Sequence, residues 1–442
     1  MVDPRTGEIL KGHVTLGSLR ARQDFVLGQG LLLPYASAGD STVVDRITET
    51  ILARLRQLGA HESGHSLLAR HNFAASTQDR ASVMDYPPPL ITLTPDGDDL
   101  DVSDAYAVGI GAWDIWAVRF AYTEFPPGAN EANELAALLR EARAAGLAYI
   151  ADQDARGLGA AEPRASLWDS GANPTAALER EMEVRRVALA RFGAGAITDG
   201  TPMSVLETVL VPLFLHHRYQ LEAAVKLVGG VYYEYAVKGD AFGDAWRTPW
   251  RAVDAGDQLV ALDAVLASIA PAELKVPAPV LALIPPPPDT YERTKENFQG
   301  ATGTFFDAFA PAESLLRITF DALLAPERLS RVHHQALTNT SLPSLAVVLD
   351  RIEVAVFNST GGAAESAYDA ALASLAQQCY VKHLYRLGSS SLSRLAMAEL
   401  RAHVTNLAAV HREWAGELGA AAQAYTAAIL GTEFYNPPGS PI

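Results

Sequence analysis

One predicted helix that carries two histidines constrains the fold of this chain more than any other feature. From Ser41 onward, apolar side chains recur at helical spacing, at Val44, Ile47, Ile51, Leu55 and Leu58. The pattern continues into the sequence GAHESGH at residues 59–65. His61 and His65 are four residues apart, so they share one face of the predicted helix.

This arrangement predicts a particular chemistry. Two imidazoles on one helix face can bind a single zinc ion through their ring nitrogens. Glu62 follows the first histidine, where its carboxylate can contact a zinc-bound water without binding the metal. Zinc makes such a water more acidic and polarises the scissile carbonyl. Glu62 would take the proton of the water and pass it to the leaving amine. We therefore expect zinc-dependent hydrolysis of a peptide or protein substrate, with Glu62 as general base.

Three further residues fit this expectation. A helix that ends just after His65 could fold the chain back and deliver His71 as a third ligand. Downstream, the sequence SVMDY places Met84 where it could form a turn beneath the metal, and Tyr86 two residues later.

The motif HESGHSLLARH followed by SVMDY resembles the metzincin clan of zinc endopeptidases, whose pattern is H-E-x-x-H-x-x-G-x-x-H with a downstream methionine turn. The resemblance implies that His61, His65 and His71 are zinc ligands and that Met84 is a hydrophobic support. It also implies that Tyr86 can reach the zinc. For Tyr86, a buried tyrosine with a satisfied hydroxyl and an oxyanion-stabilising group are alternatives of equal weight.

Other segments are similar to a narrower group. DPRTGEILKG, HNFAAS, SVMDYPPP and WDIWAVRFAY look like bacterial zinc-dependent metallopeptidases of the Met-zincin domain family, formerly a domain of unknown function. The segment IPPPPDTYERTKENFQGATGTFFDAFAPAES resembles the C-terminal part of that family. Its members usually carry a signal peptide and a preceding domain. The resemblance therefore implies a periplasmic or secreted parent protein.

Leu68 departs from the clan pattern, which has a glycine at this position. That glycine commonly takes a left-handed conformation, so that the chain turns sharply towards the third ligand. A leucine there costs on the order of 1 kcal/mol, which zinc binding, at roughly 10 kcal/mol, could offset. Alternatively, the helix continues through Leu68, and His71 then points away from His65.

Two rival functions follow from these residues. A catalytically impaired zincin that serves as a binding or scaffolding module is motivated by Leu68, whereas the presence of Glu62 argues against it. A hydrolase of a non-peptide bond is the other alternative, because an activated water is not selective by itself.

The fold class that we expect is α+β and predominantly α-helical, because the chain is rich in alanine and helical patterns recur. Two or three strands or a hairpin are expected within residues 1–35, and VYYEYAV is another predicted strand. Too few residues precede the active-site helix for a complete zincin sheet, so the sheet of the catalytic region should be partial. Four consecutive prolines at 285–288 indicate a linker. From about residue 310 to 433 the pattern is nearly all helical.

These patterns predict three parts. Residues 1–100 form a zincin-like catalytic region with the active-site helix and the methionine turn. Residues 101–284 form its mostly helical remainder, and residues 289–442 form a helical C-terminal domain. The segment from Thr201 to Gly230 is expected to be one long helix, kinked at Pro212.

Composition excludes several classes of partner. The formal net charge of −16 argues against nucleic acid, because phosphate binding needs a basic face. The longest apolar run, VLVPLFL, is far shorter than the roughly 20 residues that span a bilayer. Cys379 is the single cysteine, so no intrachain disulfide forms, and it is predicted to be a buried small hydrophobic residue.

For the remaining candidates the structural interpretation is favoured. Asp152, Asp154 and Asp169 could line the cleft or hold calcium, but their spacing fits no standard calcium loop, so a solvated loop is expected. The histidine pairs are predicted to be structural or exposed, and the two tryptophans to pack a helix on the core. These residues are His216, His217, His333 and His334, and Trp113 and Trp116.

Overall fold

Helices form most of the structure. The computed structural model describes residues 1–37, 39, 41–238, 249–357, 366–388 and 390–430. Within them the strands pair in two antiparallel sheets of two strands each, β1 with β2 and β3 with β4. The predicted class, α+β and predominantly helical, is confirmed.

The elements up to residue 290 are α1 (Leu19–Leu32), α2 (Thr42–Ser66), η1 (Ala75–Gln78), β1 (Thr92–Leu93), β2 (Leu100–Asp101), α3 (Ala112–Tyr122), α4 (Glu131–Ala144), α5 (Asp152–Ala155), α6 (Pro174–Arg191), η2 (Ala194–Ala196), η3 (Met203–Val205), α7 (Leu206–Phe214), α8 (Arg218–Val225), β3 (Val231–Tyr233), β4 (Trp250–Ala252), α9 (Ala255–Ala267), α10 (Pro271–Leu274) and α11 (Ala278–Leu283). After them come α12 (Ala310–Leu323), α13 (Pro326–Thr338), α14 (Leu345–Phe357), α15 (Ala367–Leu387), α16 (Arg394–Val410), η5 (Arg412–Trp414) and α17 (Ala415–Leu430).

The start of the chain differs from the prediction. Instead of two or three strands or a regular hairpin, residues 1–35 contain one isolated antiparallel bridge, between Val2 and Ile9, and the helix α1. Two glycines in α1 let it pack closely on its neighbours. A Cβ atom on Gly28 would lie 2.9 Å from the Ile47 side chain of α2, and one on Gly30 would lie 3.2 Å from the carbonyl of Val209 in α7. These glycines serve helix packing rather than turns.

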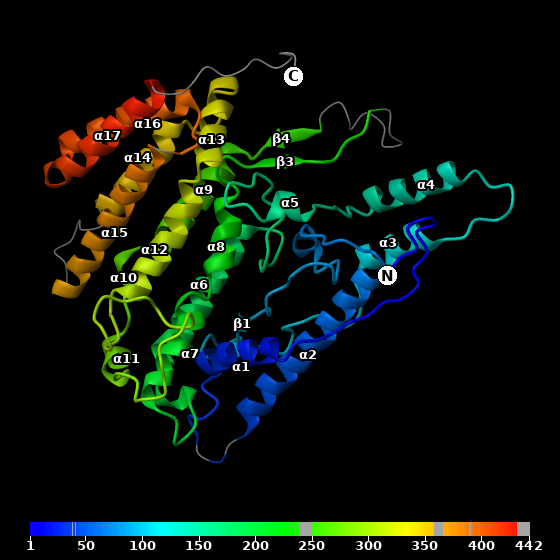
Figure 1. Cartoon of the computed structure of the whole chain (residues 1–442), viewed down its shortest axis with the longest axis horizontal. Helices are drawn as coiled ribbons and strands as arrows, with labels where there is room; N and C mark the ends of the chain where they lie inside the picture. The colour runs from blue at the N-terminus through cyan, green and yellow to red at the C-terminus, as the bar shows by residue number, and fades with distance from the viewer. Residues whose placement is uncertain (38, 40, 239–248, 358–365, 389, 431–442) are drawn as a thin grey trace.

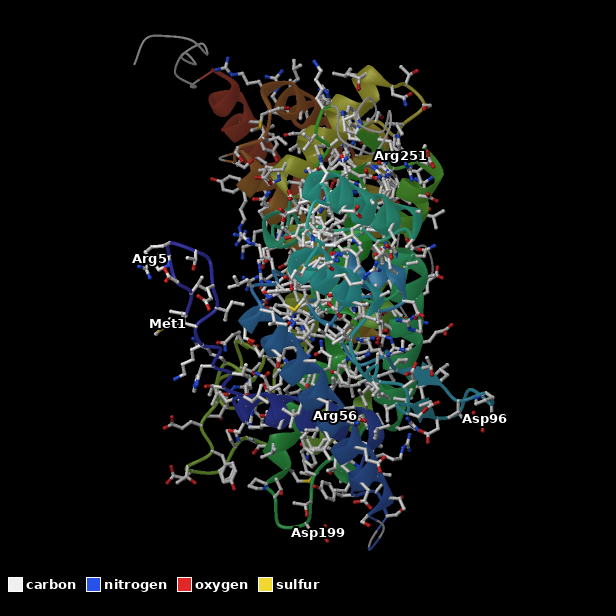
Figure 2. All side chains as sticks on the ribbon, turned by 90° about the vertical axis from the view of Figure 1, so that its right-hand side faces the viewer. Met1, Arg5, Arg56, Asp96, Asp199 and Arg251 are labelled. Carbon is white, nitrogen blue, oxygen red and sulfur yellow. The ribbon has the colours of Figure 1, made fainter. Side chains whose placement is uncertain are left out.

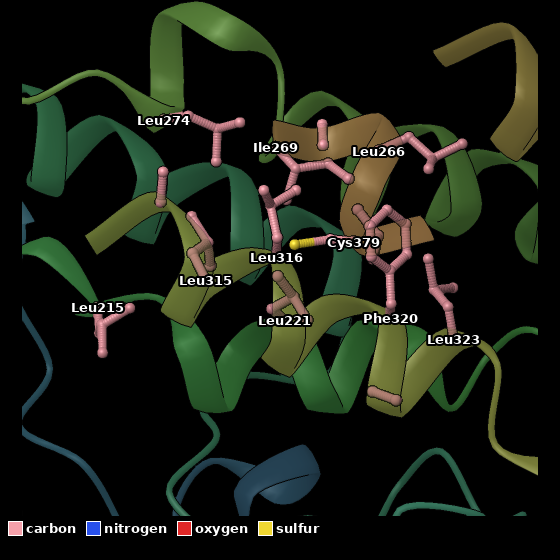
Figure 3. Packing of buried hydrophobic residues seen from close by; sticks show 14 of the residues in the cluster. Leu215, Leu221, Leu266, Ile269, Leu274, Leu315, Leu316, Phe320, Leu323 and Cys379 are labelled. Atoms are coloured by element: carbon pink, nitrogen blue, oxygen red, sulfur yellow. The ribbon is translucent and has the colours of Figure 1, made fainter. Parts of the chain in front are cut away.

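The main core lies among the middle helices. Figure 1 shows α6, α8, α9 and α12 side by side, with α14–α17 beyond them on one side and α2 on the other. Leucines from α8, α9, α10 and α12 meet there (Figure 3). Cys379 of α15 lies among them and is buried, as predicted. Burial raises the pKa of its thiol to about 11, so the sulfur stays protonated.

Several local predictions are confirmed, and one is wrong. VYYEYAV begins with β3, and residues from 310 to 430 are nearly all helical where the structure describes them. The expected long helix from Thr201 to Gly230 is instead divided into α7 and α8, with the break at Leu215–His217, whereas Pro212 lies inside α7.

Two segments project from the helical body in Figure 2, the N-terminal segment near Met1 and Arg5 and the turn with Asp96 between β1 and β2. None of the helices in the described ranges is both long and apolar enough to cross a membrane.

Candidate metal centre

The last two turns of α2 carry His61, Glu62 and His65, and His71 faces them after a turn. The Nε2 atoms of His65 and His71 lie 3.1 Å apart. The centroids of the three imidazole rings are separated by 4.6–5.3 Å. One nitrogen of each ring lies within 4.8 Å of the other two. The structure therefore brings together the three histidines chosen from their spacing, in a group that could hold one metal ion.

Leu68 makes this convergence possible. Its φ angle is 65°, the left-handed conformation that glycine commonly supplies at such a turn. α2 ends at Ser66, and the N–H of Ala69 donates to the carbonyl of Gly64 at 3.1 Å, which closes the turn. The Leu68 side chain is 55% exposed, so burial offsets little of the strain. Of the two alternatives at this position, the chain takes the turn.

Backbone carbonyls fix the two histidines of α2. His61 Nδ1 donates to the carbonyl of Val83 at 2.6 Å, and His65 Nδ1 donates to the carbonyl of Ala69 at 2.9 Å. Because a carbonyl only accepts, the proton of each neutral ring is on Nδ1 and the lone pair is on Nε2. Burial lowers the pKa of His61, and the neighbouring histidines lower it further. The neutral form is the one that binds metals.

Asp152 fixes the third histidine. Its Oδ2 accepts from His71 Nδ1 at 2.8 Å, and its Oδ1 accepts from Arg156 Nε at 2.6 Å. Burial raises the pKa of Asp152, but the hydrogen bonds from Arg156 and His71 outweigh it, so the pKa lies below its usual value. The carboxylate is thus ionised at neutral pH and holds the third ring with its Nε2 lone pair towards the other two. This role was not predicted for Asp152, for which lining the cleft was an alternative but a solvated loop was expected.

The segment that follows Asp152 is held by a distant helix. Arg328 of α13 donates to the carbonyl of Leu158 at 2.7 Å, and Arg331 donates to the carbonyls of Gly159 and Ala160 at 2.6 and 3.3 Å. Arg328 is fully buried among these and other carbonyl groups. The C-terminal helices therefore fix the loop that orients His71.

The turn around Met84 lies against α2, the helix that carries His61 and His65. Met84 is 1% exposed, and a Cβ atom on Gly64 would lie 2.3 Å from its sulfur. The carbonyl of Met84 accepts from the N–H of Asn72 at 3.0 Å, one residue after His71. Met84 is therefore a packing support between α2 and the segment with the third histidine, as expected of a hydrophobic residue there.

Asp114, at the start of α3, holds the same turn from its outer side. Its carboxylate accepts from the Ser82 hydroxyl at 2.5 Å and from the N–H groups of Val83 and Gly111 at 2.8 and 2.7 Å. Since the Val83 carbonyl fixes His61, Asp114 acts on the site through this turn. Trp113, beside it, packs in the same apolar cluster as Met84, and Trp116 packs against that cluster. Both tryptophans have the packing role that was predicted.

Tyr86 stands beside the histidines. Its ring centroid lies 4.8 Å from that of His71 and 5.3 Å from that of His61. Trp168 stacks on its other side at 5.3 Å, and the N–H of Trp168 donates to the Tyr86 carbonyl at 3.0 Å. The guanidinium carbon of Arg156 lies 5.5 Å from the Tyr86 ring. Trp168 takes a left-handed conformation, with φ of 62°, and so contributes a second strained residue to this side of the site.

The expectation of a solvated loop is wrong for Asp169, which is 2% exposed. Its Oδ2 accepts from the Ser76 hydroxyl at 3.2 Å, while Oδ2 of Asp85 accepts from the Ser76 N–H at 3.0 Å. Burial raises the pKa of Asp169 to about 7 and raises that of Asp85 well above its usual value. Sequence reasoning missed this pair because its two members lie on separate loops. Asp154, for its part, accepts from the Tyr235 hydroxyl.

Two of the other histidines, His216 and His333, have local partners, whereas neither ring nitrogen of the fully buried His217 has a hydrogen-bond partner among the described residues. His216 lies 2.7 Å from a carboxylate oxygen of Glu181, and His333 lies 2.5 Å from one of Glu399. These ion-pair contacts between neighbouring elements agree with the structural role that was predicted for them.

Three histidines on and just after one helix, above a buried methionine, define a metzincin-type domain. A family model described as Met-zincin matches residues 44–363, a span of more than half of the chain. The chain belongs to the Met-zincin family. No curated protein and no solved structure matches it.

Proposed function

We propose that this protein is a zinc-dependent endopeptidase, with zinc held by His61, His65 and His71 and with Glu62 as general base. The observation that carries the proposal is that three fixed imidazoles converge next to Glu62. A metal site with a purely structural role would not need this carboxylate. When bound, zinc acidifies a water molecule and polarises the carbonyl of the scissile bond. Membership of the Met-zincin family supports this chemistry.

The donor set fits zinc in its chemistry. Each ring donates its Nδ1 proton to a separate oxygen acceptor, which leaves the Nε2 lone pair of each ring available to a metal ion. Two such lone pairs, on His65 and His71, face each other at 3.1 Å. Without a proton or a cation between them they repel. Three neutral imidazole nitrogens are the ligand set of many catalytic zinc sites, which leave a further position open.

Glu62 has the position of a proton acceptor. It follows His61 on α2, is half-buried, and is not among the three residues that form the metal-binding group. Its carboxylate can take a proton from the attacking water and deliver it to the nitrogen of the leaving amine. A binding module would have no use for a base at this point.

Tyr86 is proposed to stabilise the negative oxygen that develops on the scissile carbonyl. Its ring is fixed between His71 and Trp168, so its hydroxyl needs little reorganisation during the reaction. Arg156, beside the same ring, adds positive charge to this side of the site.

The alternative of an impaired module was motivated by Leu68. The turn at Leu68 delivers His71 to the other histidines, so this motivation loses its physical basis. A non-peptide substrate has no specific observation in its favour.

Glu62→Gln tests the proposal. We expect hydrolysis of an unfolded protein substrate to fall by about 10²- to 10⁴-fold, because the amide cannot accept the proton, while zinc content stays at the wild-type level. Glu49→Gln makes the same chemical change at an exposed position of α2 and should leave the rate unchanged. Unchanged hydrolysis by Glu62→Gln, or a wild-type protein that binds no zinc, would contradict the assignment.

A further inference from the structure

A second group of metal-ligating side chains lies far from the three histidines. Asp350 and Glu353 are three residues apart on α14, so they share a face of that helix. His403 reaches them from α16. One ligand atom of each residue lies within 4.8 Å of those of the other two. Figure 1 shows α14 and α16 on the opposite side of the helical body from α2.

The contacts of His403 are unusual for a buried imidazole. Its side chain is 8% exposed. Its Nδ1 lies 3.5 Å from Asp350, and its Nε2 lies 3.9 Å from Glu353 and 3.5 Å from the Tyr380 hydroxyl. Hydrogen bonds between an imidazole and a carboxylate are normally near 2.8 Å. In the described part of the chain, no closer partner is recorded for either nitrogen, although burial without a good hydrogen bond is costly.

His383, on the neighbouring helix α15, shows how this protein satisfies a buried histidine with hydrogen bonds alone. It is equally buried, with 6% of its side chain exposed. Its Nδ1 donates to the carbonyl of Cys379 at 2.6 Å, and its Nε2 lies 3.0 Å from Asp321. His403 has two carboxylates within reach and yet makes neither contact at such a distance.

Separations of this size are those of donor atoms around a shared cation. Donors about 2.0–2.2 Å from one metal ion stand about 3–4 Å from one another. The 3.5 Å gap between His403 Nδ1 and Asp350 lies in this range, as does the 3.1 Å gap between His65 and His71 in the first site. The 3.9 Å gap to Glu353 is measured from the other ring nitrogen, Nε2. Glu353 belongs to the group because one ligand atom of each residue lies within 4.8 Å of those of the other two.

We propose that Asp350, Glu353 and His403 bind one divalent transition-metal ion, such as Zn²⁺ or Mn²⁺, that fastens α14 to α16. One imidazole nitrogen with two carboxylate oxygens suits such ions. The side chain of Asp350 is 67% exposed, which provides an entry path and room for water ligands. The site is independent of the proposed peptidase function.

A neighbouring histidine supports the site. His411 Nε2 lies 3.3 Å from the other carboxylate oxygen of Glu353, and its ring stacks on Phe357 at 4.0 Å. It can therefore orient Glu353, as outer partners orient metal ligands.

Equilibrium dialysis of the full chain against a zinc buffer, with metal counted by mass spectrometry, tests the proposal. We expect two ions per wild-type chain, and one in the double variant His61→Ala/His65→Ala. Asp350→Asn, at an exposed position that should not affect folding, is expected to weaken binding of the second ion at least tenfold. His403→Gln should abolish it, whereas the matched control His383→Gln should bind zinc as the wild type does.

The proposal would be overturned if the double variant still bound zinc and neither Asp350→Asn nor His403→Gln reduced that binding. It would also be overturned if the double variant bound no zinc. Circular dichroism checks that each variant is folded. Failure of the peptidase proposal would give a different result. The wild type would then lack the ion that depends on His61 and His65, and it would bind as many ions as the double variant.

Discussion

The region around the three histidines and the helical region after residue 310 are stabilised in different ways. Six residues other than glycine have positive φ in the described chain, and four of them flank the first region: Leu68, Asp79, Arg80 and Trp168. The described residues from 291 to 430 contain none. Such conformations cost on the order of 1–3 kcal/mol each and persist only where the surroundings impose them. The site is thus the strained part of the molecule, and the helical body is its regular part.

The contacts differ in the same way. The helical body depends on apolar burial summed over many side chains. The site depends on single polar contacts, such as Asp152 with His71 and Asp114 with the turn at Val83. We therefore expect single substitutions near the site to have separable effects on metal binding, packing and backbone strain.

The largest effect is expected from Asp152→Asn. Removing the charge that holds His71 should weaken zinc binding by about 10- to 100-fold, with little change in global stability, measured by chelator competition and by denaturant unfolding. Asp154→Asn changes a carboxylate two residues away in α5, paired with Tyr235 instead, and should leave zinc affinity unchanged. Equal affinities for both variants would show that the site does not depend on this single contact.

An intermediate effect is expected from Gly64→Ala. The new Cβ would overlap the buried Met84 sulfur, and we expect a loss of about 1–3 kcal/mol in the free energy of unfolding. Gly59→Ala lies on the same helix with open space around it and should gain about 0.5–1 kcal/mol from helix propensity. If the two variants shift urea unfolding alike, close packing of Met84 on α2 is not what supports the site.

The smallest effect is expected from Leu68→Gly. Relief of the left-handed strain, about 1–2 kcal/mol, is partly offset by the greater freedom of glycine in the unfolded chain, which leaves a net gain of about 0.5 kcal/mol. Leu67→Gly is the control, because Leu67 is similarly exposed and has an ordinary φ of −92°. It should lose stability. If both variants have a lower free energy of unfolding than the wild type, Leu68 is not strained.

Spacing along the sequence was sufficient to predict the parts of the site that lie close together in the chain. The helical period carries His61 and His65 to one face, and the short segment to Met84 and Tyr86 follows directly. Asp152 lies 81 residues from His71. Tertiary packing decides which acidic residue of the loop contacts His71, and no local sequence pattern encodes that packing. The burial of Asp169 is of the same kind.

The failure at the start of the chain also has a physical cause. Gly28 and Gly30 lower helix propensity, so the segment was expected to contain strands and turns. The two glycines stabilise the fold only through close packing of α1 on α2 and α7. Tertiary contact thus overrides local preference in α1, whereas in α4 and α6 the two agree.

The arginines of α13 have a consequence for the time at which the site can form. Arg328 and Arg331 donate to carbonyls of a loop that lies about 170 residues earlier in the chain. During synthesis the histidines leave the ribosome long before α13 exists. The loop that orients His71 can reach its final position only after α13 has been made and has docked. Until then, a growing chain carries all three histidines without the contacts that fix the loop beside His71.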